Sequence, residues 1–302
     1  MKMSVPDSKA VRTVFGVALL LIIFGPGAGS AGAFSIGGII NKAHKVARVG
    51  KAVEKASQDF TPEQEYYIGR AVAANILSMY PPADKPRLDA YLNLVGRALA
   101  QASDKPETFG GYHFLALKTK EVNAFACPGG FVLVSRGLLD LCRSEDDLAA
   151  VLAHEIGHVQ LEHGIKAIKQ GRMGEVTGLL VSEAVGELSP VQFGRLVDLF
   201  NKSIGDVVKR MMVNGYSREQ EFEADYAALE IMNRVGYHPR HLVEVLNRMK
   251  ARFTKKSKGF AKTHPAPAVR IETVEGYLPP GKSPQPPKVR KRRFEKALAP
   301  AP

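Results

Sequence analysis

The stretch that decides the fold is Ala149–Gly164, AAVLAHEIGHVQLEHG, which reads as one helical segment with paired histidines. It contains His154, Glu155 and His158 in the pattern H-E-x-x-H. Because an α-helix advances by about 100° per residue, positions four apart lie on one face. The two imidazoles can therefore hold one metal ion, while Glu155 faces the same cleft. This arrangement is typical of the metal ligands and general base of zinc hydrolases.

A zinc site of this kind needs a third protein ligand. His163 follows His158 by five residues and is turned by about 140° around the helix, so we expect it to pack or hydrogen-bond instead. A later stretch, SREQEFEADYAA from Ser217, places Glu221 and Asp225 on one face. The alternative for this stretch is a solvated acidic face. Combined with the upstream histidines, the pattern favours Glu221 as third ligand and Asp225 as acceptor of a ligand histidine's other N–H.

The order of predicted elements is helices, a small sheet and then helices, which indicates an α+β, mainly helical fold. Helices are expected at about 62–79, 85–102, 145–163, 217–235 and 239–253, with a short one at 269–275. Residues 112–118 and 131–134 are expected to form strands. A length of 302 residues, 45% of them hydrophobic, allows one large domain with appendages.

The formal charge of +12 is concentrated near the C-terminus, where basic residues crowd the segment 282–296. We predict that 277–302 is a basic, proline-rich, disordered tail that could touch anionic lipid or another acidic polymer. Nucleic-acid binding through this tail is the rival hypothesis. The tail has only two aromatic residues, Tyr277 and Phe294, and the protein is expected to be exported, so no nucleic-acid partner is expected.

The N-terminus reads as a targeting segment. A basic flank precedes an apolar run from Val14 to Phe24, and Ala31 and Ala33 then form an A-x-A exit. This run is shorter than the roughly 20 residues of a membrane-spanning helix, so we predict a cleaved signal peptide at 1–33. An uncleaved anchor is the alternative. Segment 34–60 is predicted to be a basic helical stretch capable of peripheral membrane contact. The protein is accordingly expected to be exported, to the periplasm or the outer face of a membrane.

The two cysteines, Cys127 and Cys142, are too few for a cysteine zinc cage. They could form a disulfide in an oxidising compartment, but the sequence does not place their Cα atoms.

Several stretches, in order, resemble the gluzincin family that includes the HtpX heat-shock, CAAX prenyl, BepA-like and Oma-like proteases. They are EQEYYIGR, EVNAFACPGG, RGLLDL, LAAVLAHEIGHVQLEHG, SREQEFEAD and THPAPAVRI, and they span about Thr61 to Ile271. The resemblance implies a zincin-like metallopeptidase domain at 61–276, with a small β-sheet beside the active-site helix and one Zn²⁺ per chain. It maps the third ligand onto Glu221 and the orienting aspartate onto Asp225. It also places His264 near the zinc as a candidate catalytic residue and gives Arg270 an anchoring ion pair.

The same resemblance suggests that a sheet edge beside the active-site helix binds substrate as an added strand. The predicted substrate-binding residues are Gly130, Phe131, Val132, Leu133 and Val134; a plain core strand is the alternative. The family's membrane-embedded members have spans that this chain lacks, which favours the soluble exported branch.

The resulting functional hypothesis is a zinc-dependent endopeptidase with Glu155 as general base and His264 as a stabiliser of the oxyanion. Its expected substrates are misfolded or unassembled cell-envelope polypeptides. The alternative is a chaperone-like envelope factor that cuts only occasionally.

Overall fold

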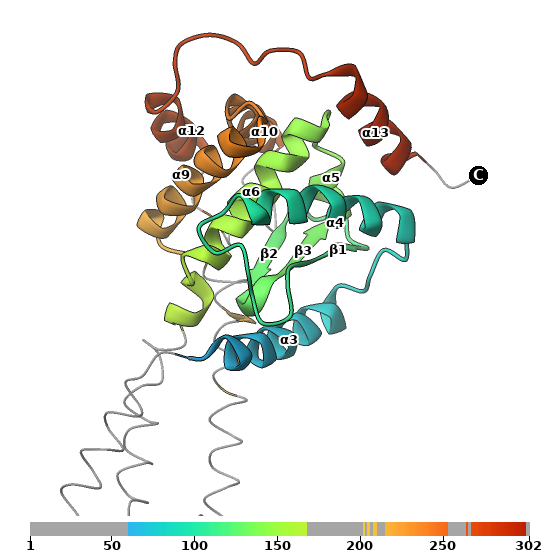
Figure 1. The fold of residues 1–302 in the computed structure, drawn as a ribbon, viewed down its shortest axis with the longest axis vertical. Coiled ribbons are helices and arrows are strands. Elements are labelled where there is room, and N and C mark those ends of the chain that lie inside the picture. The colour runs from blue at the N-terminus through green and yellow to red at the C-terminus, as the bar shows by residue number, and fades with distance from the viewer. Residues whose placement is uncertain are drawn as a thin grey trace, which may run out of the picture. The chain divides into compact units, whose positions relative to one another are not determined.

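The computed structural model describes residues 60–167, 202, 204, 205, 208, 209, 215–252, 264 and 267–299, all from the unit Arg48–Pro302. Its elements are α3 (Pro62–Met79), α4 (Pro86–Gln101), β1 (His113–Leu117), β2 (Ala124–Cys127), η1 (Pro128–Gly130), β3 (Phe131–Ser135), α5 (Arg136–Leu139), α6 (Glu145–Gln160), α9 (Arg218–Val235), α10 (Arg240–Arg252), α12 (Pro267–Gly276) and α13 (Lys288–Leu298). Helices dominate and one small sheet lies among them (Figure 1), which confirms the predicted α+β, mainly helical class.

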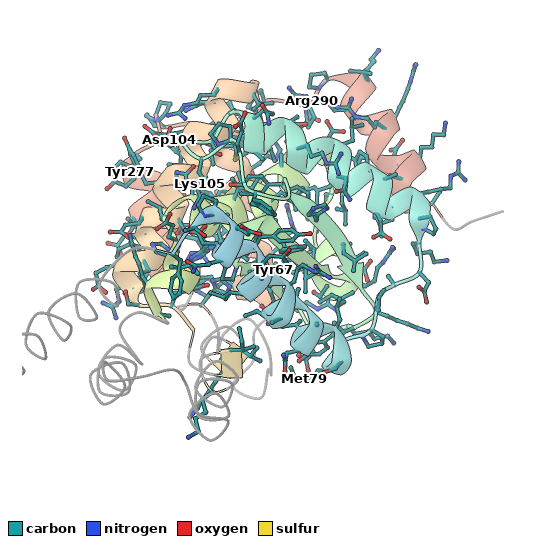
Figure 2. All side chains as sticks on the ribbon, turned by 60° about the horizontal axis from the view of Figure 1, so that its bottom comes forward. Tyr67, Met79, Asp104, Lys105, Tyr277 and Arg290 are labelled. Atoms are coloured by element: carbon teal, nitrogen blue, oxygen red, sulfur yellow. The ribbon has the colours of Figure 1, made fainter. Side chains whose placement is uncertain are left out.

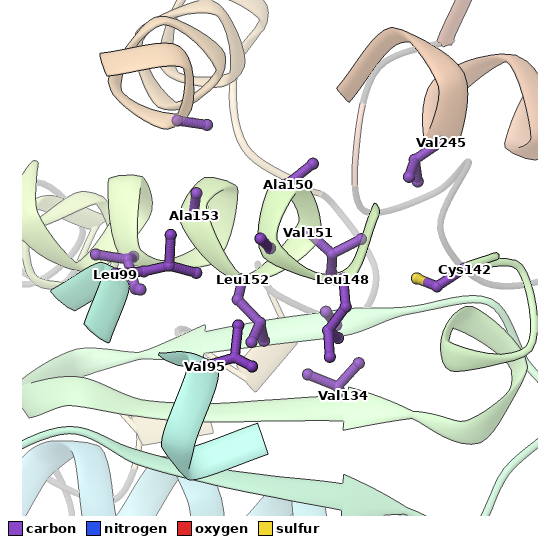
Figure 3. Packing of buried hydrophobic residues seen from close by; sticks show 14 of the residues in the cluster. Val95, Leu99, Val134, Cys142, Leu148, Ala150, Val151, Leu152, Ala153 and Val245 are labelled. Atoms are coloured by element: carbon purple, nitrogen blue, oxygen red, sulfur yellow. The ribbon is translucent and has the colours of Figure 1, made fainter. Parts of the chain in front are cut away.

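Helix α6, which carries H-E-x-x-H, is the centre of the fold. It begins after Ser144, whose hydroxyl accepts a hydrogen bond from the backbone N–H of Asp147 at 3.1 Å. Every residue from Glu145 to Val159 is buried, so neighbours enclose the helix on all sides. Figure 3 shows Leu148 and Leu152 of α6 pointing toward Val134 of the sheet and Val95 of α4.

The sheet separates two hydrophobic clusters because successive side chains on a strand point to opposite faces. Val132 and Val134 belong to the larger cluster with α4, α6, α9 and α10. Leu133, between them, belongs with Phe125 and Cys127 to the smaller cluster against α3. The sheet therefore lies between α3 on one face and the helix carrying the histidines on the other.

The strand order is β1-β3-β2, and it corrects the prediction for the substrate-binding edge. Strand β3 pairs in parallel with β1, where His113 lies opposite Phe131, and antiparallel with β2, where Ala124 lies opposite Val134. The backbone of Phe131–Val134 is thus paired with a strand on both sides. No substrate strand can add to β3, and the alternative of a plain core strand holds.

Helices α6 and α9 approach closely at a glycine. A Cβ on Gly157 would stand 2.9 Å from the carbonyl oxygen of Ala224, closer than real Cβ contacts allow. Helix α9 starts with a reciprocal capping box between Ser217 and Gln220 and ends at Gly236, which has a φ of 80°. These signals position α9 so that its inner face meets the histidines of α6.

The C-terminal segment differs from the predicted disordered tail. Residues 288–298 form α13, and Phe294 on this helix is only 7% exposed. Arg293 Nε bonds Glu145 Oε2 at 2.6 Å, and Arg290 Nη1 bonds Asp146 Oδ1 at 3.0 Å. A tail of like charges is disordered when water alone solvates it. Here two of its arginines have buried carboxylate partners at the start of α6, so this part of the tail folds.

Cys127 and Cys142 are both free and buried, so they do not form the disulfide that the sequence left open. The predicted signal peptide at 1–33 and nearly all of the basic segment at 34–60 lie outside the described residues. Among the helices described, none combines the length and the apolar character needed to cross a membrane.

Candidate metal centre

Three predicted ligands converge where α6 meets α9. His154 Nε2 and His158 Nε2 lie 3.2 Å apart, as expected for positions four apart on a helix. Glu221 of α9 places Oε2 3.5 Å from His154 Nε2 and Oε1 3.5 Å from His158 Nε2. Ligand atoms about 2.0–2.1 Å from a tetrahedral zinc ion are about 3.3 Å from one another. These separations are close to that value, so the three residues can hold one tetrahedral metal ion.

His264 completes a group of four. Its Nδ1 lies 2.7 Å from Glu221 Oε1, and its side chain is buried. One ligand atom from each of His154, His158, Glu221 and His264 lies within 4.8 Å of the others. The sequence offered no local reason to bring His264 here; only the family resemblance did. The group can hold one divalent ion among His154, His158 and Glu221, and the imidazole of His264 would lie beside that ion.

Asp225 lies beside His154, where the spacing of α9 placed it. Its Oδ1 is 3.0 Å from His154 Nδ1, so a metal-binding Nε2 leaves the Nδ1–H to donate to Asp225. Arg270 of α12, 1% exposed, donates from Nε to Asp225 Oδ2 at 2.8 Å and has Nη1 3.2 Å from Glu221 Oε2. The anchoring ion pair expected for Arg270 is present, and it joins Glu221 to Asp225.

The charges around the site favour the ligand forms that metal binding requires. Burial alone would raise the pKa of Glu221, but His264 and Arg270 outweigh it and hold that pKa well below its usual value. Burial lowers the pKa of His158 to about 3, which keeps this imidazole neutral. Burial and Arg270 oppose protonation of His154, yet Asp225 and Glu221 raise its pKa to about 9. A cation between these groups would take the place of that proton.

His163 lies beside the predicted ligand His158 and outside the group of four. Its Nδ1 is 2.8 Å from His158 Nδ1, and its Nε2 is 3.1 Å from Glu223 Oε2. If His158 binds metal through Nε2, its Nδ1–H donates to His163, whose own Nε2–H then donates to Glu223. Tyr216 stacks on His158 with ring centroids 4.2 Å apart. Sequence reasoning excluded His163 as a ligand and missed both Glu223 and Tyr216 as supporting residues.

Glu155 follows His154 on α6 and is 2% exposed. Burial raises the pKa of its carboxyl group, which makes it a stronger base than an exposed glutamate. Gly130 and Phe131–Val134, by contrast, are part of the central strand and the turn before it. They are not brought to the metal group as a free edge.

Comparison with known proteins identifies the domain. The profile of Peptidase family M48 matches residues 86–278, more than half of the chain. The "Mitochondrial metalloendopeptidase OMA1" of Saccharomyces cerevisiae is 32% identical over 174 residues, which are 55% of this chain and 46% of that protein. The "Beta-barrel assembly-enhancing protease" of Escherichia coli (strain K12) is 29% identical over 213 residues, 69% of this chain and 42% of that protein.

A third relative, the "Metalloprotease LoiP" of Escherichia coli (strain K12), is 26% identical over 159 residues, 53% of this chain and 60% of that protein. The chain thus spans about half the length of the curated relatives it matches. The matched range contains His154, His158, Glu221 and His264, the four residues that the fold brings together. Their convergence and the family match agree: this chain belongs to peptidase family M48.

Proposed function

We propose that this chain is a zinc-dependent endopeptidase that hydrolyses misfolded or unassembled cell-envelope polypeptides. The observation that carries the proposal is the buried group of His154, His158, Glu221 and His264, whose ligand atoms lie within 4.8 Å of one another. Nitrogen and carboxylate ligands in tetrahedral reach suit zinc, and three such ligands leave a position for water.

The chain's own residues would divide the work of hydrolysis. Zinc, when bound, supplies a Lewis acid and a water of lowered pKa. Glu155 accepts a proton from the attacking water and passes it to the leaving amine, a task suited to a carboxylate whose pKa burial raises. His264 donates a hydrogen bond where negative charge develops on the scissile carbonyl oxygen. Asp225 and Arg270 keep His154 and Glu221 in place.

The proposed location and substrates rest on two supports. The N-terminal sequence has the basic flank, short apolar run and A-x-A exit of a secretory signal. One relative is named "Beta-barrel assembly-enhancing protease". Together they favour an exported protease whose partners are unfolded envelope polypeptides, with peripheral membrane contact through its basic segments.

Glu155→Gln is the experiment that tests this function. The variant should keep its zinc, since Glu155 is not a ligand, and lose at least about 100-fold in cleavage of an unfolded outer-membrane polypeptide. The matched control is Glu230→Gln on α9, whose side chain is 40% exposed; it should cleave like the wild type. Full activity of Glu155→Gln would refute the peptidase assignment. If Glu155→Gln instead prevents aggregation and restores assembly of the client as well as wild type does, the chaperone-like alternative gains support.

A further inference from the structure

A second cavity lies away from the metal group, where α13 meets the start of α4. It has a volume of about 670 Å³, within the range of about 300–1,000 Å³ that small-molecule sites occupy. Its walls come from the first turn of α4, the loop after β1, the start of α5 and the C-terminal end of α13. In Figure 1, α13 lies beside the end of α4 that forms this cavity. None of the four candidate metal ligands lines it.

The cavity is strongly cationic. Six basic side chains line it and only one acid, Asp84, does; the six are Lys85, Arg87, Lys118, Lys120, Arg136 and Lys296. Arg136 pairs with Asp140 at 2.9 Å. Among the residues that the structure describes, the other five have no carboxylate within ion-pairing distance. The cavity therefore holds a concentrated positive charge that an anion can neutralise.

The start of α4 adds to this field. Lys85, the N-cap residue of α4, makes no side-chain capping bond, whereas Thr61, Ser144 and Ser217 cap α3, α6 and α9. Pro86 has no N–H, and the N–H groups of Leu88 and Asp89 donate to the carbonyl of Lys85, so no acidic or hydroxyl cap offsets the positive end of the helix at the cavity. This feature strengthens a site that the six cations already define.

The floor of the cavity is aliphatic. Leu88 is buried in the main core, while Ala83, Ala297 and Leu298 are partly buried against it. Among the described lining residues none is aromatic, so the cavity has no platform on which nucleic-acid bases could stack. Cations around an aliphatic floor match a molecule with an anionic head and a hydrocarbon tail.

The surface beside the cavity has the same character. Helix α13 turns Phe294 inward and leaves Lys288, Lys291 and Arg292 exposed. Figure 2 places Arg290 at the start of this helix, where it bonds Asp146 and holds α13 against α6. A folded, basic α13 next to a cationic cavity suits a plane of anionic headgroups better than one small anion.

We propose that this cavity binds an anionic phospholipid, with the phosphate among Lys85, Lys118 and Lys120 and part of an acyl chain against Leu88 and Leu298. Such a lipid would gain from both the aliphatic contact and the charge of the lysines. A free phosphate lacks the hydrocarbon, and a zwitterionic lipid lacks the net negative charge. The site is independent of the proposed peptidase activity.

The test is calorimetric titration of the full chain with a short-chain phosphatidylglycerol below its micelle concentration. Glycerol phosphate and a short-chain phosphatidylcholine are the comparison ligands. We expect phosphatidylglycerol to bind at least about tenfold more tightly than either, because only it offers both charge and hydrocarbon. Equal affinity for glycerol phosphate would identify a free-phosphate site. Equal affinity for phosphatidylcholine, or no binding of phosphatidylglycerol, would overturn the proposal as well.

Two charge-matched variants locate the site. Lys118→Gln with Lys120→Gln removes two cations from the cavity and should weaken phosphatidylglycerol binding by about tenfold or more. Lys250→Gln with Arg252→Gln removes two exposed cations from α10, which contributes nothing to the cavity, and should leave binding unchanged. Equal weakening by both pairs would mean diffuse charge attraction and refute the site.

Lys85→Gln with Lys296→Gln is the second cavity pair if the first fails to fold. Displacement of the lipid by a single-stranded oligonucleotide of higher affinity would favour a polyanion site and also contradict the proposal.

Discussion

Glu221 is the residue that most directly separates a metal centre from a cluster of buried polar groups. A carboxamide in its place loses the charge that attracts a divalent cation. We expect Glu221→Gln to lower zinc affinity by more than the roughly 10- to 100-fold that removing a supporting residue costs. Glu230→Gln is the matched control, because Glu230 lies on the same helix with its side chain 40% exposed and pairs with Arg234 rather than with the metal group. Metal analysis after dialysis measures both variants, and equal zinc contents would contradict the ligand role.

The sequence predicted residues whose geometry is local to one helix. His154 and His158 follow from a spacing of four, as do Glu221 and Asp225, and all four lie where that spacing implies. His264 came only from family resemblance, because a residue in a loop has no periodicity to place it. Tyr216 could not be predicted, since nothing local to either residue indicates that its ring stacks on His158.

At the scale of elements, the distance between α6 and α9 sets the ligand geometry. Gly157 allows this distance, because a Cβ there would stand 2.9 Å from Ala224 O. We expect Gly157→Ala to push α9 away, to weaken zinc binding and to lower the free energy of unfolding by about 1–3 kcal/mol. Gly276→Ala on α12 is the control, since a Cβ there meets no atom within 4 Å. Zinc titration and urea unfolding measure both; unchanged zinc affinity in Gly157→Ala would show that α9 is not held at a critical distance.

The elements themselves were easier to predict than their partners. Capping residues and apolar periodicity located α3, α4, α6, α9 and α10, since those signals lie within each segment, whereas the one-turn helix α5 was not predicted. The prediction that β3 is an edge strand was wrong, because β3 lies between β1 and β2. A short apolar run does not reveal whether one or two strands pair with it. Helix α13 was missed because composition counts charges, whereas its folding depends on Glu145 and Asp146, far away in the sequence.

At the scale of the whole molecule, the buried start of α6 ties distant elements together. Glu145 accepts hydrogen bonds from Tyr91 of α4 and from Tyr237, which follows α9, each at 2.9 Å, and it pairs with Arg293 of α13. Asp147 bonds His241 at 2.7 Å and Arg248 at 2.6 Å, both on α10. The helix that carries the metal ligands is thus fixed by the same acids that hold the C-terminal half of the domain.

These acids make the stability of the domain depend on pH in a defined direction. Burial opposes ionisation of Asp147, but His241 and Arg248 hold its pKa below the usual value. A folded-state pKa below the unfolded value of about 3.9 adds stability that is fully present above that pH and is lost as pH falls through the folded-state pKa. The contribution of Asp147 to the free energy of unfolding should therefore be constant near neutral pH and fall below about pH 4.

Asp147→Asn tests this link between the acids and the fold. The variant should lose about 3 kcal/mol of unfolding free energy at pH 7, because it leaves Arg248 without its buried partner. It should also lose less than wild type between about pH 4 and pH 2, since it lacks the carboxylate that titrates. Asp140→Asn, whose side chain is 49% exposed and pairs with Arg136, should follow the wild type within about 1 kcal/mol. Urea unfolding of all three proteins, measured without metal, gives both quantities. Parallel pH profiles for Asp147→Asn and wild type would mean that Asp147 does not link the start of α6 to α10 through its charge.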